Sequence, residues 1–302
     1  TIHSTYRAAT VRTGRLSSSD PNMQQVSKKL RPAFIPRPGH LIADLDYSQL
    51  ELRITAYISR SEPMLKAYNE GQDLHSLLAA DILTRRLHHE NPEAPPIPAS
   101  EVSPTWRQAA KAANFGLIYG QGVVGFRSYA DSVYGVEFSE EEAQEIYDGF
   151  FQTWEGITAW HERTKAQVAR QGYITSPNGR RRLLPNITSG NDFLRGEAER
   201  QALNAPVQGL GSDLMQMALA WIYGELPGTE PVPGVIPVAT VHDSLVAEVP
   251  IEGWEEAVRE CQWRMENLDE HLARLGVELD VPLVAEATVG TRWGLSDIFS
   301  PD

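Results

Sequence analysis

The 302-residue chain has a single cysteine, Cys261. An internal disulfide and a zinc site built from several cysteines are therefore excluded. The sequence also lacks any run of about 18 apolar residues, so no membrane-spanning helix is predicted. Residues 1–15 have no apolar core of the kind that marks a secretion signal. These absences exclude disulfide-stabilised and membrane-spanning classes of protein.

The chain lacks an excess of positive charge, with 27 Lys+Arg against 40 Asp+Glu and a net charge of −13. Phosphate binding needs cations, so the negative net charge by itself argues against a nucleic-acid partner. The charge is uneven, however. Residues 1–60 carry a net +5, residues 241–302 a net −10, and residues 163–182 contain six basic residues and no acidic one. A local basic surface can guide a polyanion, although solvated charged faces are the alternative interpretation.

Hydrophobic residues make up 41% of the chain and charged residues 22%, which is typical of a folded protein of one large or two moderate domains. Residues 1–40 are rich in chain breakers and predicted to be irregular. Strands and helices are then intermixed without a βαβ rhythm, which favours an α+β fold over a doubly wound sheet. Strands are predicted at 40–47, on either side of 242–244 and at 281–289, and a hairpin at 172–184. Helices are predicted at 49–59, 73–83, 105–119, within 140–171, at 192–223 with an interruption at Pro206, and at 254–275, and a proline-rich loop at 85–104.

Two aspartates, Asp46 and Asp243, stand where predicted strands end. A strand end holds a side chain rigidly while leaving it accessible, and Mg²⁺ prefers hard oxygen ligands. Two such carboxylates can hold a pair of Mg²⁺ ions about 3.5–4 Å apart. The alternative is that each is a turn or cap residue. Asp44 is the alternative ligand, although it is two residues back along the strand and hence on the same face as Asp46.

Arg107, Lys111, Phe115 and Tyr119 follow one another at intervals of four residues. This spacing places them on one face of a helix, with two cations leading into two aromatic rings. The cations could bind a triphosphate and the rings could stack on a base. The alternative is an amphipathic helix with a charged beginning and a buried aromatic end.

Five segments in this order resemble the palm and fingers of family A DNA polymerases, to which bacterial DNA polymerase I belongs. They are TGRLSSSDPN (13–22), DYSQLELR (46–53), RQAAKAANFGLIYG (107–120), NAPVQGLGSDLM (204–215) and VHDSLV (241–246). The resemblance implies an antiparallel palm sheet with helices in residues 1–60 and 176–302, and mainly helical fingers in 61–175. It also implies that the family's upstream thumb and exonuclease domains are absent, either trimmed or supplied by a separate chain.

The resemblance further implies site residues. Asp46, Asp243 and the Tyr47 carbonyl match the ligands of two Mg²⁺ ions, for which Mn²⁺ can substitute, and Lys111 also matches the proton donor to the leaving pyrophosphate. The residues that match the nucleotide-binding set are Gln49, Glu51, His75, Arg107, Lys111, Phe115 and Tyr119. Within this set Glu51 resembles the steric gate against a ribose 2′-OH, which points to dNTP.

A further set matches primer–template DNA contacts: Arg15, Asn22, Arg200, Asn204, Gln208 and His242. Several match minor-groove contacts, where acceptors of every correct base pair are similarly placed, so donors can check pair shape without reading sequence. The alternative for Asn204 and Gln208 is helix capping and internal hydrogen bonding. In this reading the basic residues 163–182 track the DNA backbone.

The chain departs from the family at Ser244, where a glutamate is usual after His242–Asp243. Serine supplies no carboxylate, so we expect activity with an altered metal dependence. Glu248 lies four residues further along the strand and is expected to be too distant to substitute.

The sequence thus predicts a template-directed DNA polymerase core that adds dNMP to a primer 3′-OH by two-metal phosphoryl transfer. Its expected location is intracellular and cytoplasmic, in a bacterial or phage-infected cell, or in an organelle, without a membrane partner.

The alternative function is that of a non-catalytic DNA-binding module that retains the polymerase fold. A related RNA polymerase or reverse transcriptase and a metal-dependent nuclease are less favoured, because Glu51 opposes RNA synthesis and a nuclease does not need the Arg107–Tyr119 face.

Overall fold

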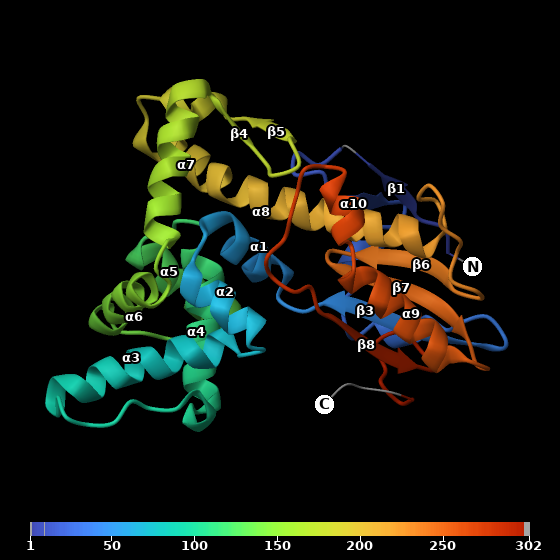
Figure 1. Ribbon diagram of the computed structural model, residues 1–302, viewed down its shortest axis with the longest axis horizontal. Coiled ribbons are helices and arrows are strands. Elements are labelled where there is room, and N and C mark those ends of the chain that lie inside the picture. Colours follow the sequence, from blue (N-terminus) through green and yellow to red (C-terminus); the bar gives the residue numbers. More distant parts are fainter. Residues whose placement is uncertain (1, 9, 299–302) are drawn as a thin grey trace. The chain divides into compact units, whose positions relative to one another are not determined.

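The computed structural model describes residues 2–8 and 10–298, which form two compact units (Figure 1). Unit 1 comprises the described residues of Thr1–Glu51, Ser176–Arg180 and Gln208–Asp302, and unit 2 comprises Leu52–Thr175 and Arg181–Val207. Helix α1 (Leu50–Ser59) begins in unit 1 and ends in unit 2, and helix α8 (Asp192–Ile222) runs in the opposite order.

A four-stranded antiparallel sheet organises unit 1, with the strand order β6-β7-β3-β8. Its strands are β3 (His40–Tyr47), β6 (Ile236–Val241), β7 (Ser244–Pro250) and β8 (Ala285–Gly290). β3 lies between β7 and β8, and Asp46 is paired with Ser244 on one side and Glu286 on the other. The predicted strand 40–47, the hairpin around 242–244 and the α+β class are confirmed.

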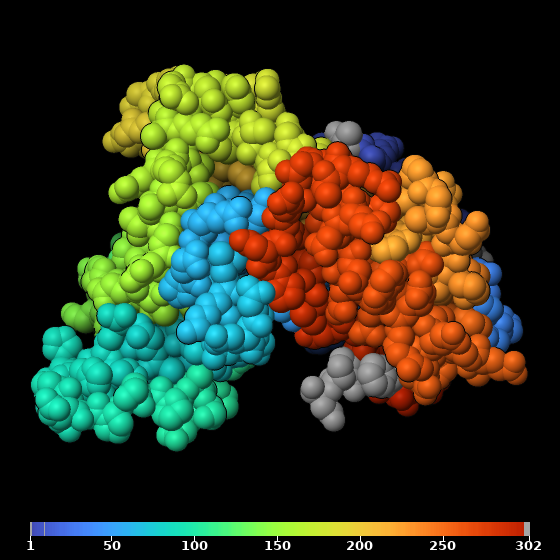
Figure 2. All heavy atoms as spheres, in the orientation of Figure 1, coloured from blue at the N-terminus to red at the C-terminus, as the bar shows by residue number. Residues whose placement is uncertain are grey.

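One face of β3 is entirely apolar. Leu41, Ala43, Leu45 and Tyr47 are all buried, as the two-residue period of a strand requires. Helix α9 (Trp254–Glu266) covers this face, and the Tyr47 hydroxyl donates a 2.7 Å hydrogen bond to the Met265 carbonyl. The outer sides of α9 and α10 (Asp269–Ala273) belong to the surface visible in Figure 2, in orange to red.

The other face of β3 changes from apolar to acidic along the strand. Ile42 packs in a cluster with Met23, Val246 and Trp293. Two residues further on, Asp44 accepts a 3.0 Å hydrogen bond from Trp293 Nε1. The Arg31 guanidinium lies 3.7 Å from Asp44 and 4.7 Å from the centre of the Trp293 ring. The apolar cluster therefore anchors the strand just before Asp46.

The amino-terminal segment is more regular than predicted. Strands β1 (Thr5–Arg7) and β2 (Ser17–Ser19) form an antiparallel pair, and 3₁₀ turns occupy Met23–Gln25 and Arg31–Ala33. The Tyr6 hydroxyl donates to the Thr240 carbonyl at 3.1 Å, which fastens this pair to β6. A contact across 234 residues of sequence explains why local propensity missed the pair.

Unit 2 is mainly helical, and α3, α4, α5 and α6 pack against one another. Its elements besides the shared helices are α2 (Glu62–Asn69), α3 (Leu74–Glu90), α4 (Pro104–Leu117), α5 (Val123–Tyr134), α6 (Glu140–Thr153), α7 (Ile157–Gln171), β4 (Tyr173–Thr175), β5 (Arg181–Leu183), and 3₁₀ turns at Ala99–Glu101 and Pro185–Thr188. Asp73, Ser103 and Ser139 cap three of these helices through side-chain oxygens that accept backbone N–H groups.

Two predicted interruptions are wrong. α8 continues through Pro206, because buried Leu203, Val207 and Leu210 on either side hold the helix against the cost of an interior proline, about 3 kcal/mol. α3 continues past residue 85 to Glu90, so the predicted loop 85–104 begins only after the helix. Arg86 explains this extension, since it pairs with Glu145 of α6 at 2.6 Å.

Three predicted boundaries also move. The helix predicted at 254–275 divides into α9 and α10, with buried Leu268 at the break. The last strand begins at Ala285, whose N–H donates to Glu266 at 2.8 Å. α4 ends at Leu117, so Tyr119 lies just beyond the helix.

Among the residues described, no helix is both long enough and apolar enough to span a bilayer.

We predict that Trp293 stabilises unit 1 through both its bulk and its N–H group. Trp293→Phe, which leaves Asp44 without its indole donor, should lower the free energy of unfolding by about 1–3 kcal/mol. Trp293→Ala should cost about 3–5 kcal/mol. Urea denaturation followed by circular dichroism measures both. The control is Trp263→Phe at a half-exposed tryptophan of the same unit; a cost equal to that of Trp293→Phe would contradict the role of the Asp44 contact.

Candidate functional site

The end of β3 and the β6–β7 turn bring Asp46 and Asp243 together in unit 1. The Tyr47 N–H donates to the Asp243 carbonyl at 3.2 Å, and Asp46 is paired with Ser244. Asp46 is exposed at the surface, yet the loss of surrounding water and the charges of Asp243, Asp44 and Glu286 raise its pKa to about 6. Burial also raises the pKa of Asp243, which the Arg15 charge partly offsets. The site therefore concentrates more negative charge than its surroundings neutralise.

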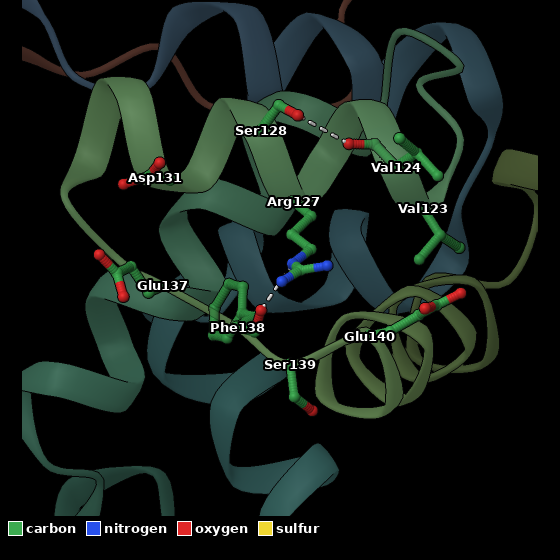
Figure 3. A pocket seen from close by; sticks show the side chains of 9 residues that line it. All are labelled: Val123, Val124, Arg127, Ser128, Asp131, Glu137, Phe138, Ser139 and Glu140. Atoms are coloured by element: carbon green, nitrogen blue, oxygen red, sulfur yellow. Dashed lines mark hydrogen bonds between the residues drawn. The ribbon is translucent and has the colours of Figure 1, made fainter.

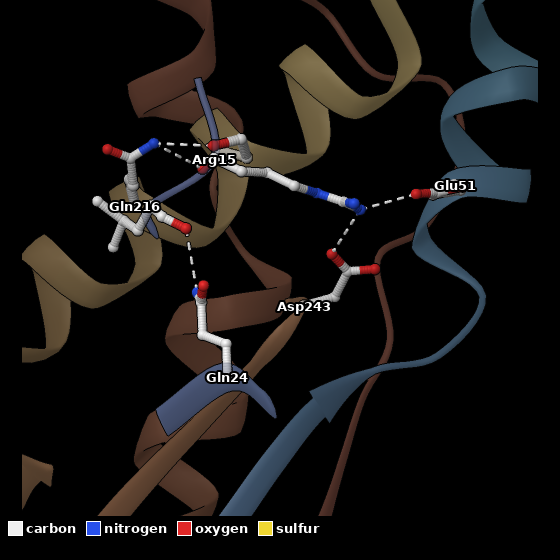
Figure 4. A network of polar contacts seen from close by, with 7 residues as sticks. Arg15, Gln24, Glu51, Gln216 and Asp243 are labelled. Carbon is white, nitrogen blue, oxygen red and sulfur yellow. Dashed lines mark hydrogen bonds and ion pairs between the residues drawn. The ribbon is translucent and has the colours of Figure 1, made fainter. Parts of the chain in front are cut away.

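Arg15 forms ion pairs with Asp243 and Glu51 (Figure 4). Its Nη2 lies 2.7 Å from Glu51 Oε1 and 3.4 Å from Asp243 Oδ1. The backbone on both sides of Arg15 is held: Gln216 donates to the Gly14 carbonyl and Gln24 to the Leu16 carbonyl, each at 3.1 Å. These bonds fix the segment from which the guanidinium reaches the acidic side chains.

Two residues that flank the carboxylates have strained backbones. Gln49 (φ 54°) follows β3, and His242 (φ 57°) precedes Asp243 in the β6–β7 turn. A left-handed conformation of a non-glycine residue costs on the order of 1–3 kcal/mol and tends to occur at functional sites. Both residues were predicted site residues on other grounds, so the strain coincides with the predicted site.

The available donors suit a hard divalent cation. Asp46 and Asp243 offer carboxylate oxygens, and the Tyr47 carbonyl is a further oxygen, while the Tyr47 side chain is buried against α9. Within residues 2–8 and 10–298, no group of three or more His, Cys, Asp or Glu side chains is arranged to hold a metal ion. The two aspartates thus fit a site at which the remaining ligands come from water and substrate.

Two residues lie opposite Asp46 on the neighbouring strands: Ser244, which the sequence analysis singled out, and Glu286, which it did not. Ser244, the departure from the family pattern, is buried opposite Asp46 on β7. Glu286 lies opposite Asp46 on β8 and contributes to its raised pKa. Glu248 is engaged elsewhere, in an ion pair with Arg37. The alternation of Glu286 between buried Ala285 and Ala287 was the sequence signal for its place on this face.

In unit 2, the start of α4 is tied to the start of α3. Arg107 forms a double contact with Asp73, with Nε 2.8 Å from Oδ2 and Nη2 3.3 Å from Oδ1. Asp73 also accepts from the Ser76 N–H at 3.0 Å, as the cap of α3. Partial burial would raise the Asp73 pKa, but the hydrogen bonds from Arg107 and Ser76 prevail and lower it to about 2. Arg107 is therefore held at the surface by a firmly ionised carboxylate.

Lys111 and Phe115 follow Arg107 along the same face of α4, and both are half-buried. Lys111 forms no ion pair with any residue in the described part of the chain, so its charge is available to an anion. The Phe115 ring centre lies 5.9 Å from that of His75. The predicted cationic and aromatic face is thus present, with Tyr119 half-buried just past the helix end.

His75 is part of a buried hydrogen-bonded chain of three side chains. Its Nδ1 accepts from Asn114 Nδ2 at 2.9 Å, and Asn114 Oδ1 accepts from Trp154 Nε1 at 2.9 Å. The three residues come from α3, α4 and the end of α6, and at most 2% of each is exposed. Burial lowers the pKa of His75 to about 4. Sequence reasoning identified His75 but missed Asn114 and Trp154, whose spacing gives no local signal.

The predicted DNA-contact residues occupy different settings. Arg200, Asn204 and Gln208 stand four residues apart on α8, with Arg200 exposed and the other two half-buried. Asn204 Oδ1 is buried and lacks a hydrogen-bond partner within the described ranges. Asn22 accepts from the Gln24 N–H at 3.0 Å and so caps a 3₁₀ turn.

The basic residues of 163–182 are largely engaged within the chain. Lys165 pairs with Glu199 at 3.3 Å, and Arg180 pairs with Asp213. Arg182 donates to Gln201 at 2.9 Å, and the Arg181 guanidinium lies 5.1 Å from the centre of the Tyr173 ring. These contacts limit the charge that this segment can offer to a polyanion.

A separate hollow lies between α5 and the start of α6 (Figure 3). Arg127 reaches across it and donates to the Phe138 carbonyl at 2.7 Å. Its lining contains none of the predicted site residues, so it is distinct from both clusters described above.

Comparison with known proteins identifies the family. The family model described as DNA polymerase family A matches residues 1–295. The chain is 37% identical over 298 residues to DNA polymerase I of Pseudomonas aeruginosa, covering 97% of this chain and 30% of that protein. It is 34% identical to the thermostable DNA polymerase I of Thermus aquaticus, covering 97% of this chain and 32% of that one. The chain therefore spans about a third of the length of these relatives.

The fold agrees with this comparison. A solved structure, the POL domain of Pol1 from M. smegmatis in complex with DNA primer–template and dNTP, matches with a TM-score of 0.80 and 30% identity. The match covers 97% of this chain and 48% of that one. The chain belongs to DNA polymerase family A.

Proposed function

We propose that the chain is the catalytic core of a DNA-directed DNA polymerase, which adds dNMP to the 3′-OH of a primer as the template directs. The observation that carries the proposal is the proximity of Asp46, at the end of β3, and Asp243, in the adjoining β6–β7 turn, in a chain that matches family A over residues 1–295. In this proposal unit 1 acts as the palm and unit 2 as the fingers.

The palm carboxylates would bind divalent cations. Asp46, Asp243 and the Tyr47 carbonyl would hold two Mg²⁺ ions, with Mn²⁺ able to substitute. When bound, the ions would activate the primer 3′-OH and stabilise charge on the leaving phosphates. Arg15 already places a positive charge beside Asp243, 3.4 Å away, which supports the view that these carboxylates need a counter-charge. Glu51, the other partner of Arg15, would exclude a ribose 2′-OH.

The α4 face would bind the nucleotide. Arg107 and Lys111 would hold the triphosphate, and Lys111 would give a proton to the leaving pyrophosphate. His75 would add a phosphate contact. Phe115 would stack on the sugar and base, and Tyr119 and Gln49 would complete the nucleotide-binding set. Anchoring of the triphosphate by fixed cations supplies positioning and electrostatic stabilisation, the two main contributions in phosphoryl transfer.

Primer–template DNA would be held by a separate set of donors: Arg15, Asn22, Arg200, Asn204, Gln208 and His242. Arg200, Asn204 and Gln208 stand four residues apart on α8, which supports a contact made by one face of that helix. Asn22 is also a cap, so its DNA contact would use the amide nitrogen that the cap leaves over.

A non-catalytic DNA-binding module is the second candidate, and Ser244 is the observation that favours it. Ser244 lies beside Asp46, where the family's glutamate would add a carboxylate. Primer extension distinguishes the candidates, because a binding module would retain DNA affinity without adding nucleotides.

We predict that the chain extends a labelled primer with Mg²⁺ and dNTPs, and that the added base changes when the template base is changed. Asp46→Asn and Asp243→Asn, which keep the shape but remove the charge, should each lower the rate by about 10²–10³-fold or more. Glu278→Gln, at an exposed carboxylate of unit 1, is the matched control. No extension with enzyme in excess, or extension that survives both aspartate changes, would contradict the proposal.

We predict that Arg107→Ala and Lys111→Ala weaken nucleotide use specifically. Each change removes a charged contact with phosphate worth about 1.5–3 kcal/mol, so kcat/KM for dNTP should fall by about 10–100-fold. Steady-state kinetics at fixed primer–template gives this ratio. Lys66→Ala, at an exposed lysine of unit 2, should leave it unchanged. An equal loss in all three variants would indicate a general structural effect.

A further inference from the structure

The hydrogen-bonded chain Trp154–Asn114–His75 has only one consistent arrangement of its protons. The indole Nε1–H can only donate a hydrogen bond. The Asn114 atom that faces it, 2.9 Å away, must therefore be the carbonyl oxygen Oδ1. This fixes the orientation of the amide and directs Nδ2, which can only donate, toward His75.

The orientation of Asn114 then determines the tautomer of His75. Because Asn114 Nδ2 donates to His75 Nδ1 at 2.9 Å, Nδ1 must carry a lone pair. The proton of the neutral ring is consequently on Nε2. Nε2 has no hydrogen-bond partner among the residues that the structure describes, yet it is not one of the fully buried partnerless atoms, so the small exposed part of this ring can donate to a ligand.

The surroundings of His75 keep the ring neutral. Burial lowers its pKa to about 4, the charge of Asp73 opposes this shift, and the charges of Arg107 and Lys111 add to it. These three charged groups lie at the starts of α3 and along α4, and Phe115 is the aromatic neighbour. A neutral imidazole with Nε2–H is therefore a hydrogen-bond donor that lies near two cations, Arg107 and Lys111, and one carboxylate, Asp73.

We propose that Trp154 and Asn114 are positioning residues that hold His75 in the Nε2–H tautomer, so that it donates to a phosphate oxygen of the bound nucleotide. This inference rests on the proposed function. In the opposite tautomer Nε2 would present a lone pair to phosphate, which repels it. The hydrogen bonds of Trp154 and Asn114 thus select one of the two neutral tautomers of His75, the one in which Nε2 is a donor.

The tautomer can be measured without any activity. In a long-range ¹H–¹⁵N NMR spectrum of the ¹⁵N-histidine-labelled chain, His75 should show an unprotonated Nδ1 and a protonated Nε2 at neutral pH. His75→Gln identifies the signals. Trp154→Phe, which keeps a ring but removes the N–H, should leave Asn114 free to turn over and give a mixture of tautomers. Trp160→Phe, at a buried tryptophan of the same unit, is the control and should leave the His75 signals unchanged.

A second variant has a distinctive pH profile. In Asn114→Asp the carboxylate accepts from both neighbours, so the neutral His75 should carry its proton on Nδ1 and its pKa should rise. Below this raised pKa the ring is doubly protonated and Nε2–H is present. Above it Nε2–H is lost, so KM for dNTP should increase by about 10–100-fold as pH rises through the raised pKa. The unsubstituted chain should lack this increase.

Three outcomes distinguish the inference from the proposed function. A His75 proton on Nδ1 in the unsubstituted chain would overturn the inference. The inference would also be overturned if KM for dNTP were the same in Trp154→Phe, Asn114→Asp and the unsubstituted chain at every pH. If the chain shows the expected tautomer but binds no dNTP, the proposed function fails, and the role of His75 toward phosphate fails with it.

Discussion

The register of β3 between β7 and β8 is the constraint on which the site in unit 1 depends. It pairs Asp46 with Ser244 and Glu286, and it brings the turn that carries Asp243 alongside the end of β3. A slip of one residue would turn every side chain of β3 to the opposite face and bury the carboxylates. The apolar face under α9 and the anchoring of Asp44 by Trp293 oppose such a slip. Packing on both faces of the sheet thus holds the carboxylates close together despite their mutual repulsion. The charge of Arg15 offsets only part of that repulsion.

In unit 2, a single carboxylate, Asp73, organises a cationic site, whereas the site in unit 1 is acidic. Asp73 caps α3 and holds Arg107 of α4, which aligns the beginnings of the two helices. Further along, His75 and Asn114 join the same helices inside the unit. The cations and aromatic rings of α4 are thereby presented from a rigid pair of helices. Under the proposed function, the two units divide the chemistry between them, with oxygen ligands for cations in one and cations for phosphate in the other.

The sequence predicted those features whose signal is local. The alternation in β3 and the turn between β6 and β7 were correctly located, and the four-residue spacing correctly placed Arg107, Lys111 and Phe115 on one face of α4. The wrong predictions at Pro206 and at the end of α3 arose because tertiary packing overrides a local breaker. Glu286 and the Trp154–Asn114–His75 chain were not predicted, because they depend on partners 39 to 240 residues away in sequence, whose proximity only the fold determines.

Under the proposed function, Asp46 and Asp243 together hold divalent cations, and this can be tested by measuring Mn²⁺ binding. Electron paramagnetic resonance can count free and bound Mn²⁺ for the chain mixed with dNTP and a primer–template whose primer lacks a 3′-OH, so that no chemistry occurs. We predict that the chain binds Mn²⁺ beyond the amount held by dNTP and DNA alone. This excess should be lost in Asp46→Asn and in Asp243→Asn, but retained in Glu248→Gln, whose carboxylate on β7 pairs with Arg37. An equal excess of bound Mn²⁺ in all four proteins would contradict the proposal, since the cations would then be held by groups other than these two aspartates.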